Sequence, residues 1–124
     1  MSPGKPVLVV EDDGDSCSAL IEMMALEGIP AVGAGNGAEA IDRFNEGLRP
    51  CAIVLDLNLP LIDGSGFLKM RRIDPELARI PVLVITGADK TISDFPDMNV
   101  VAVFRKPFDP LLVVDAVRAF RGRS

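Results

Sequence analysis

Histidine, tryptophan and tyrosine are absent from the chain, and cysteine occurs only twice. Without histidine, the chain cannot bind a metal through imidazole, use imidazole as a general base or carry a phosphorylated histidine of its own. Cys17 and Cys51 lie in apolar patterns typical of small core residues, and so few cysteines favour a reducing compartment. We therefore expect a cytoplasmic protein.

Long apolar runs and large basic clusters are also missing. No run approaches the ~20 apolar residues that cross a bilayer, and residues 1–6 lack the apolar core of a signal peptide. The 13 lysines and arginines are outnumbered by 18 aspartates and glutamates, which leaves a net charge of −5. This balance argues against nucleic acid or a membrane as a direct partner of the chain.

The composition is that of one globular domain. A chain of 124 residues that is 48% hydrophobic can bury a sizeable core but has no room for a second module. We expect a single domain over residues 1–124, with its folded core over about 6–121.

Short apolar runs alternate with segments in which apolar residues recur at helical spacing. The runs predict five strands, at residues 6–10, 29–34, 51–56, 80–85 and 100–104. The third run has no polar alternation, which is typical of a strand buried on both faces. This alternation predicts an α/β fold, a doubly wound five-stranded parallel sheet with five helices.

Four of the predicted strands end at polar side chains. These are Glu11 and Asp12 after the first strand, Asp56 at the end of the third, Thr86 after the fourth and Lys106 after the fifth. In such folds the site lies at the carboxyl ends of the strands, so we expect these residues to lie close together. A carboxylate beside two acids, a hydroxyl and an ammonium group is suited to phosphoryl transfer onto Asp56, with Mg²⁺ bound by the acids.

A simpler interpretation needs no chemistry. Asp56 and Lys106 would form a salt bridge at the edge of the sheet, and the other acids would be solvated. In both interpretations Asp13 and Asp15 are suited to cap the helix that follows the first strand.

Four sequence motifs carry a family resemblance. They are Leu8-Val9-Val10-Glu11-Asp12, Leu55 to Pro60 with Asp63-Gly64, Thr86-Gly87, and Lys106-Pro107-Phe108. In their order and separations they resemble the receiver domain of bacterial two-component response regulators, over essentially the whole chain. The resemblance implies a flavodoxin-like fold with strand order 2-1-3-4-5 and a role as a phosphorylation-dependent signalling switch.

The same resemblance implies roles for single residues. Asp56 would accept a phosphoryl group from a histidine kinase or a histidine phosphotransfer protein, assisted by Thr86 and Lys106, and the Lys106–Pro107 bond would be cis. Asp12 and Asp56 would bind Mg²⁺ directly, Glu11 through water and Asn58 by its backbone carbonyl. A downstream protein would dock on the face formed by the fourth helix, the fifth strand and the fifth helix.

Three positions depart from the family pattern. Val103 stands where an aromatic residue commonly swings inward with the threonine, so we expect that coupling to be absent or altered, and Phe104 not to replace it. Pro96 interrupts residues 91–99, so the fourth helix should be short, bent or mobile. Ala88 lacks the acid or amide that positions a hydrolytic water in some relatives, which predicts slow to moderate self-dephosphorylation.

Two rival functions belong to other classes. A haloacid-dehalogenase-like phosphatase also uses a nucleophilic aspartate with Mg²⁺, but it needs a second aspartate two residues later as a general acid, and this chain has Asn58. A phosphorylation-independent interaction module would be expected to have lost an active-site residue, and none is lost. We therefore expect no enzyme activity beyond the chain's own phosphorylation and dephosphorylation.

Overall fold

The computed structural model describes residues 5–58 and 64–121. A five-stranded parallel sheet forms its centre, in the order β2-β1-β3-β4-β5. The strands are β1 (Val7–Val10), β2 (Ala31–Ala34), β3 (Ala52–Asp56), β4 (Val82–Thr86) and β5 (Val100–Arg105). The predicted fold class and strand order are confirmed.

Burial follows the position of each strand in the sheet. Every residue of β1, β3 and β4 is buried, whereas β2 and β5 at the two edges are mostly half-buried. Apolar β-branched residues fill the central strands because helices cover both of their faces. Asp56 and Thr86, the last residues of β3 and β4, are therefore buried polar groups.

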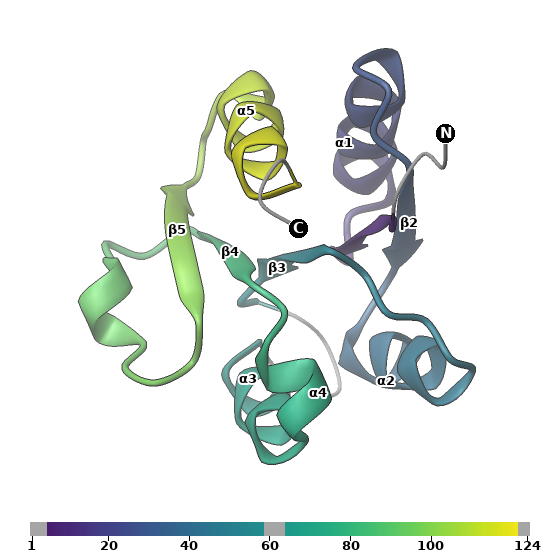
Figure 1. Ribbon diagram of the computed structural model, residues 1–124. Helices are drawn as coiled ribbons and strands as arrows, with labels where there is room; N and C mark the ends of the chain where they lie inside the picture. Colours follow the sequence, from purple (N-terminus) through teal and green to yellow (C-terminus); the bar gives the residue numbers. More distant parts are fainter. Residues whose placement is uncertain (1–4, 59–63, 122–124) are drawn as a thin grey trace.

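The helices form two layers (Figure 1). On one face lie α1 (Gly14–Leu26) and α5 (Pro110–Arg121), and on the other lie α2 (Gly37–Asn45), α3 (Gly64–Ile73) and α4 (Pro75–Ala78). Capping carboxyl and amide groups define where they begin, because Asp13, Asn36 and Asp74 each accept a backbone N–H of the following turn. No helix in the described ranges is long and apolar enough to span a membrane.

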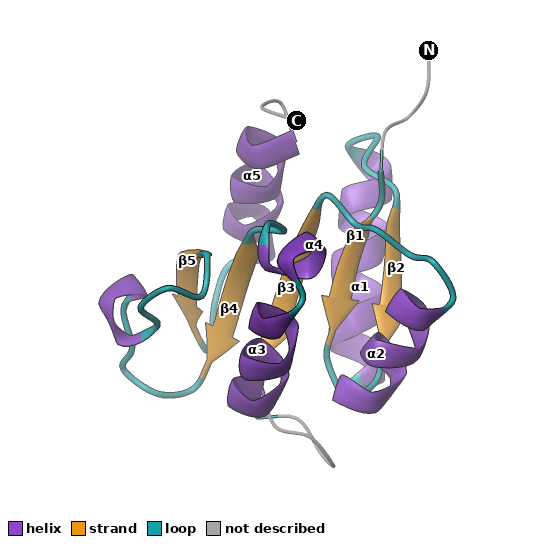
Figure 2. Ribbon diagram, turned by 60° about the horizontal axis from the view of Figure 1, so that its bottom comes forward, coloured by secondary structure: helices purple, strands orange, loops and turns teal. Residues whose placement is uncertain are grey.

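The fourth helix is not where strict alternation places it. The short helix α4 follows α3 directly, because Asp74 and Pro75 end one helix and start the next. Between β4 and β5, the described chain has only the 3₁₀ helix η1 (Ile92–Asp94), which Figure 2 shows beside β5. The predicted fourth helix is therefore reduced to one short 3₁₀ turn. After Pro96, Asp97 and Asn99 adopt left-handed backbone angles, with φ of 60° and 53°.

Neighbouring residues of β5 point to opposite faces of the sheet. Val103 packs against the core cluster under α2 and α3, and Phe104 packs against the cluster under α1 and α5. Because strand side chains alternate, Phe104 cannot occupy the position of the missing aromatic. The structure thus agrees with the expectation that Phe104 does not replace it.

Arg71 on α3 is the most unexpected residue of the core. It is only 2% exposed, whereas Met70 and Ile73 on the same helix are 47% and 83% exposed. Its guanidinium group donates to the carbonyl oxygens of Met98 at 2.8 Å and Ile80 at 2.6 Å, and to that of Ala78 at 3.3 Å. Arg71 therefore ties α3 to the starts of β4 and β5.

Candidate functional site

Three carboxylates meet where β1 and β3 end. Glu11, Asp12 and Asp56 each place a carboxylate oxygen within 4.8 Å of the others. Glu11 and Asp56 are buried, and Asp12 is exposed to solvent. This arrangement of hard oxygen donors, with one side open, fits a metal site for a divalent cation.

Lys106 reaches the same point from the far edge of the sheet. Its Nζ lies 2.7 Å from Asp56 Oδ2 and 3.9 Å from Glu11 Oε2, although β4 separates β3 from β5. The Lys106 backbone N–H donates to the Thr86 carbonyl at 2.8 Å, which anchors the residue where β5 ends. The Lys106–Pro107 peptide bond is cis, as the family resemblance predicted.

The charges in the site depend on one another. Burial alone would raise the pKa of Asp56, but the hydrogen bonds from Lys106 and from the Asn58 N–H outweigh it, so the pKa of Asp56 is lowered. Desolvation opposes the charge on Lys106, yet its hydrogen bond to Asp56 raises its pKa. Burial, and then the neighbouring Asp56 carboxylate, raise the pKa of Glu11 from 4.5 to about 7. Asp56 is therefore an ionised, oriented carboxylate.

Backbone groups hold the acids in place. Glu11 Oε1 accepts the Asp13 N–H at 3.1 Å, and Asp56 Oδ1 accepts the Asn58 N–H at 2.9 Å. Asp13 accepts from the Asp15 N–H and the Ser16 hydroxyl, both at 3.0 Å, so its capping role is confirmed. The predicted ligand role of the Asn58 carbonyl stays a prediction, and the motif residues Leu59, Pro60 and Asp63 lie outside the described ranges.

Thr86 completes the group of strand ends. Its side chain is 3% exposed, and its Oγ1 accepts the Ala88 N–H at 3.1 Å. The structure therefore brings together Glu11, Asp12, Asp56 and Lys106 by measured contacts, and it places Thr86 on the strand between Asp56 and Lys106.

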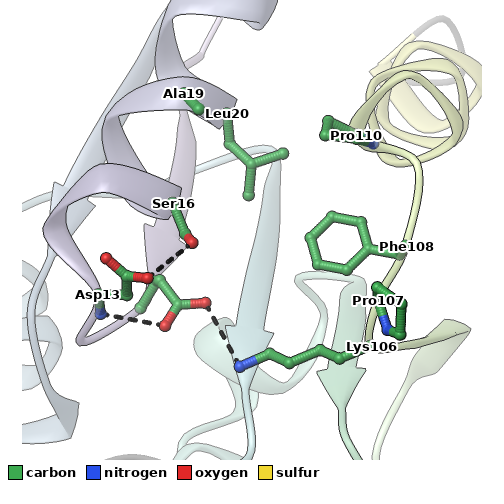
Figure 3. A pocket seen from close by; sticks show the side chains of 9 residues that line it. Asp13, Ser16, Ala19, Leu20, Lys106, Pro107, Phe108 and Pro110 are labelled. Carbon is green, nitrogen blue, oxygen red and sulfur yellow. Dashed lines mark hydrogen bonds and ion pairs between the residues drawn. The ribbon is translucent and has the colours of Figure 1, made fainter.

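A pocket next to the site was missed by sequence reasoning. It has a volume of about 520 Å³ and lies between the start of α1 and the loop from β5 to α5 (Figure 3). Glu11 and Lys106 form its polar end, while Leu20, Phe108 and Pro110 supply apolar surface. The sequence contained one indication of this pocket. Ser16, Ala19 and Leu20 are spaced to share one face of the first helix, and the loop that forms the other wall contains two prolines, Pro107 and Pro110.

Comparison with known proteins assigns the family. Residues 7–118 match the family model described as response regulator receiver domain. The chain belongs to this family: it is a receiver domain of the kind found in two-component response regulators.

Relatives and solved structures agree with this assignment. The chain is 29% identical over 114 residues to sporulation initiation phosphotransferase F of Bacillus subtilis, covering 92% of this chain and 91% of that protein. It is 41% identical over 82 residues to the transcriptional regulatory protein PrrA of Mycobacterium tuberculosis, covering 65% of this chain but only 34% of that longer protein. The receiver domain of the Francisella response regulator 1452 has the same fold, with a TM-score of 0.85, 24% identity and coverage of 97% and 98% of the two chains.

Proposed function

We propose that this receiver domain is switched by phosphorylation of Asp56, with Mg²⁺ bound by the neighbouring acids. The observation that carries the proposal is the environment of Asp56: a buried carboxyl group 2.7 Å from the Lys106 ammonium group and within 4.8 Å of the Glu11 and Asp12 carboxyl groups. A purely structural salt bridge between Asp56 and Lys106 does not need two further carboxyl groups at the same point.

The residues divide the work of phosphoryl transfer. A carboxylate oxygen of Asp56 forms a bond to phosphorus as the phosphorus–nitrogen bond of a donor phosphohistidine breaks, and the imidazole leaves with the electron pair. Lys106 pairs with a phosphoryl oxygen, and the Thr86 hydroxyl donates to another. Glu11, Asp12, Asp56 and the Asn58 carbonyl would hold Mg²⁺, which supplies charge neutralisation for the phosphoryl oxygens.

The donor is proposed to be a histidine kinase or a histidine phosphotransfer protein. These 124 residues contain no histidine, so a donor phosphohistidine has to lie outside them. The pocket beside the site offers that partner an apolar surface between α1 and the β5–α5 loop, with Lys106 at its inner end (Figure 3). A histidine side chain presented there would meet Lys106, whose Nζ lies 2.7 Å from Asp56 Oδ2.

Output is proposed to pass to a protein rather than to nucleic acid or a membrane. The face formed by η1, β5 and α5 carries exposed apolar side chains, with Ile92, Leu111 and Leu112 being 51%, 49% and 55% exposed. Such a surface suits protein contact. Here η1 takes the place that the predicted fourth helix had in the docking face.

Turnover of an external phosphoester is not part of the proposal. Asn58 cannot donate the proton that a leaving alkoxide needs, so the chain acts only on its own aspartyl phosphate. Its localisation is proposed to be cytoplasmic.

The direct test is phosphorylation by a small donor. The purified chain is incubated with Mg²⁺ and acetyl phosphate, and its intact mass is followed. We expect the gain of one phosphoryl group, which is lost with a chelator and in Asp56→Asn but kept in Asp42→Asn, a matched change at an exposed acid of α2. Release of phosphate without a phosphorylated chain would instead support the phosphatase.

A further inference from the structure

The Thr86 hydroxyl is bonded to the segment that leaves the site. Its Oγ1 accepts the Ala88 N–H at 3.1 Å, and the side chain is 3% exposed. A hydroxyl that accepts one hydrogen bond can still donate its own hydrogen. When Thr86 donates to a phosphoryl group on Asp56, the Ala88 backbone either follows the hydroxyl or loses this bond.

On the face of the sheet under α2 and α3, the fifth strand offers no aromatic side chain to sense this change. Val103 occupies the face of the sheet under α2 and α3, and Phe104 packs on the opposite face under α1 and α5. A rotation of Phe104 would therefore act on the wrong core cluster. A structural change that begins at Thr86 therefore has to be transmitted by a residue outside β5.

The connection from β4 to β5 contains a buried aromatic residue of its own. Phe95 is 9% exposed and belongs to the same core cluster as Val103. It directly follows η1, and its backbone N–H donates to the Ile92 carbonyl at 3.0 Å. Residues 87–94 are all exposed, so only a short solvent-facing segment lies between the Thr86 hydroxyl and the Phe95 ring.

The far end of the connection is held in place. Arg71 donates to the Met98 carbonyl at 2.8 Å, and the Asn99 side chain donates to the Arg79 carbonyl at 3.0 Å. Of the two left-handed residues, Asn99 makes one of these bonds itself, and Asp97 directly precedes Met98. We therefore expect movement that begins at Thr86 to affect residues 87–95 more than the anchored residues 98 and 99.

We propose that Phe95 is the mobile aromatic residue of this switch. Engagement of Thr86 displaces Ala88 and the η1 segment, and the Phe95 ring shifts within the core cluster that it shares with Val103. The exposed Ile92, three residues before Phe95, moves with it and changes the proposed docking face. This inference rests on the proposed phosphorylation of Asp56.

Fluorine NMR can follow this ring directly. The chain has six phenylalanines and no other aromatic residue, so labelling with 4-fluorophenylalanine gives one probe at each phenylalanine. Phe95→Leu assigns the resonance of interest. With Mg²⁺ and acetyl phosphate, we expect the Phe95 resonance to shift in proportion to the phosphorylated fraction, measured by intact mass on the same sample. Phe104 packs against the opposite core cluster, so its resonance is expected to shift less than that of Phe95.

Variants of Thr86 separate coupling from chemistry. At equal phosphorylated fraction, Thr86→Ser should keep the Phe95 shift and Thr86→Val should lose it, because only serine retains the hydroxyl. A phosphorylated native chain with a stationary Phe95 resonance overturns this inference alone, as does an unchanged Phe95 shift in phosphorylated Thr86→Val. Failure of the native chain to gain a phosphoryl group overturns the proposed function and this inference together.

Discussion

The ends of the strands and the β4–β5 connection lie side by side but follow different constraints. At the strand ends, Glu11, Asp12, Asp56, Thr86 and Lys106 match the family motifs, and four of these side chains meet through measured contacts. In the connection, the described chain has a 3₁₀ helix of three residues and two left-handed residues, and the strand that follows has a valine, Val103, in the aromatic position.

The difference separates chemistry from its transmission. Phosphoryl transfer needs particular functional groups at fixed separations, so few residue types can serve at the strand ends. Transmission needs only a segment with two arrangements whose equilibrium the site can bias. The same phosphoryl-transfer site can therefore be coupled to a different mobile segment, here the β4–β5 connection.

The largest effect is expected at the acidic cluster. Asp12→Asn removes one charged oxygen ligand, and we expect Mg²⁺ affinity to fall about 100-fold, while the connection keeps its structure. Titration of Mg²⁺ followed by calorimetry measures the change, and Asp42→Asn serves as the exposed control. Equal Mg²⁺ affinity in Asp12→Asn and the native chain would remove Asp12 from the metal site.

Arg71→Met should weaken the β4–β5 connection and leave the acidic cluster intact. It leaves the carbonyls of Ile80 and Met98 without their guanidinium donor, so we expect the free energy of unfolding to fall by about 2–3 kcal/mol. Arg72→Met, at an exposed neighbour, should change it by less than about 0.5 kcal/mol. Urea unfolding measures both. Equal stabilities would mean that Arg71 does not hold the connection, whereas loss of acetyl phosphate reactivity in folded Arg71→Met would show that the two regions are not separable.

Val103→Tyr asks whether the connection can accept the aromatic residue that the family pattern favours. Val103 packs against a core that already contains Phe95, so we expect the larger side chain to destabilise the fold by about 1–3 kcal/mol through overpacking. The combination with Phe95→Ala should recover part of this loss, because it frees volume in the same cluster. Strictly additive losses in urea unfolding would place the two side chains in independent sites.

The smallest effect is expected at Asp97. Its φ of 60° is left-handed, so Asp97→Gly should raise the free energy of unfolding by about 0.5 kcal/mol and Asp97→Ala should lower it by about 1 kcal/mol. The two variants differ only in backbone preference and the β-carbon. Should both variants unfold at the same urea concentration, strain at this residue would contribute nothing to the connection.

Much of the fold could be predicted from the sequence because its signals are local. Apolar runs such as Val82 to Ile85 identify strands, and residues such as Asn36 and Asp109 mark where helices begin. The polar residues at the strand ends could also be predicted to meet, because parallel strands bring their carboxyl ends to one edge. The part of the site that could be predicted is therefore the part that the order of parallel strands brings together.

The remainder depended on tertiary packing. In the sequence, Arg71 looks like one member of an exposed basic pair, and only the fold reveals that three carbonyls from two segments, before β4 and before β5, accept from it. The placement of α4 was missed because Asp74 and Pro75 can either end a helix or start another, and both happen here. The pocket was missed because its walls come from α1 and the β5–α5 loop, far apart in sequence.

The contact between Lys106 and Asp56 also bears on how the chain folds. It joins residues separated by 50 positions, and β3 and β5 are connected in the sheet only through β4, which pairs with both. A chain growing from its N-terminus has all three acids in place long before Lys106 is available to pair with them. Contacts of such long sequence separation form late, because the loop has to close before they contribute stability. The pairing of Asp56 is therefore among the last steps of folding, and a chain that ends before β5 contains the acids but not their cation.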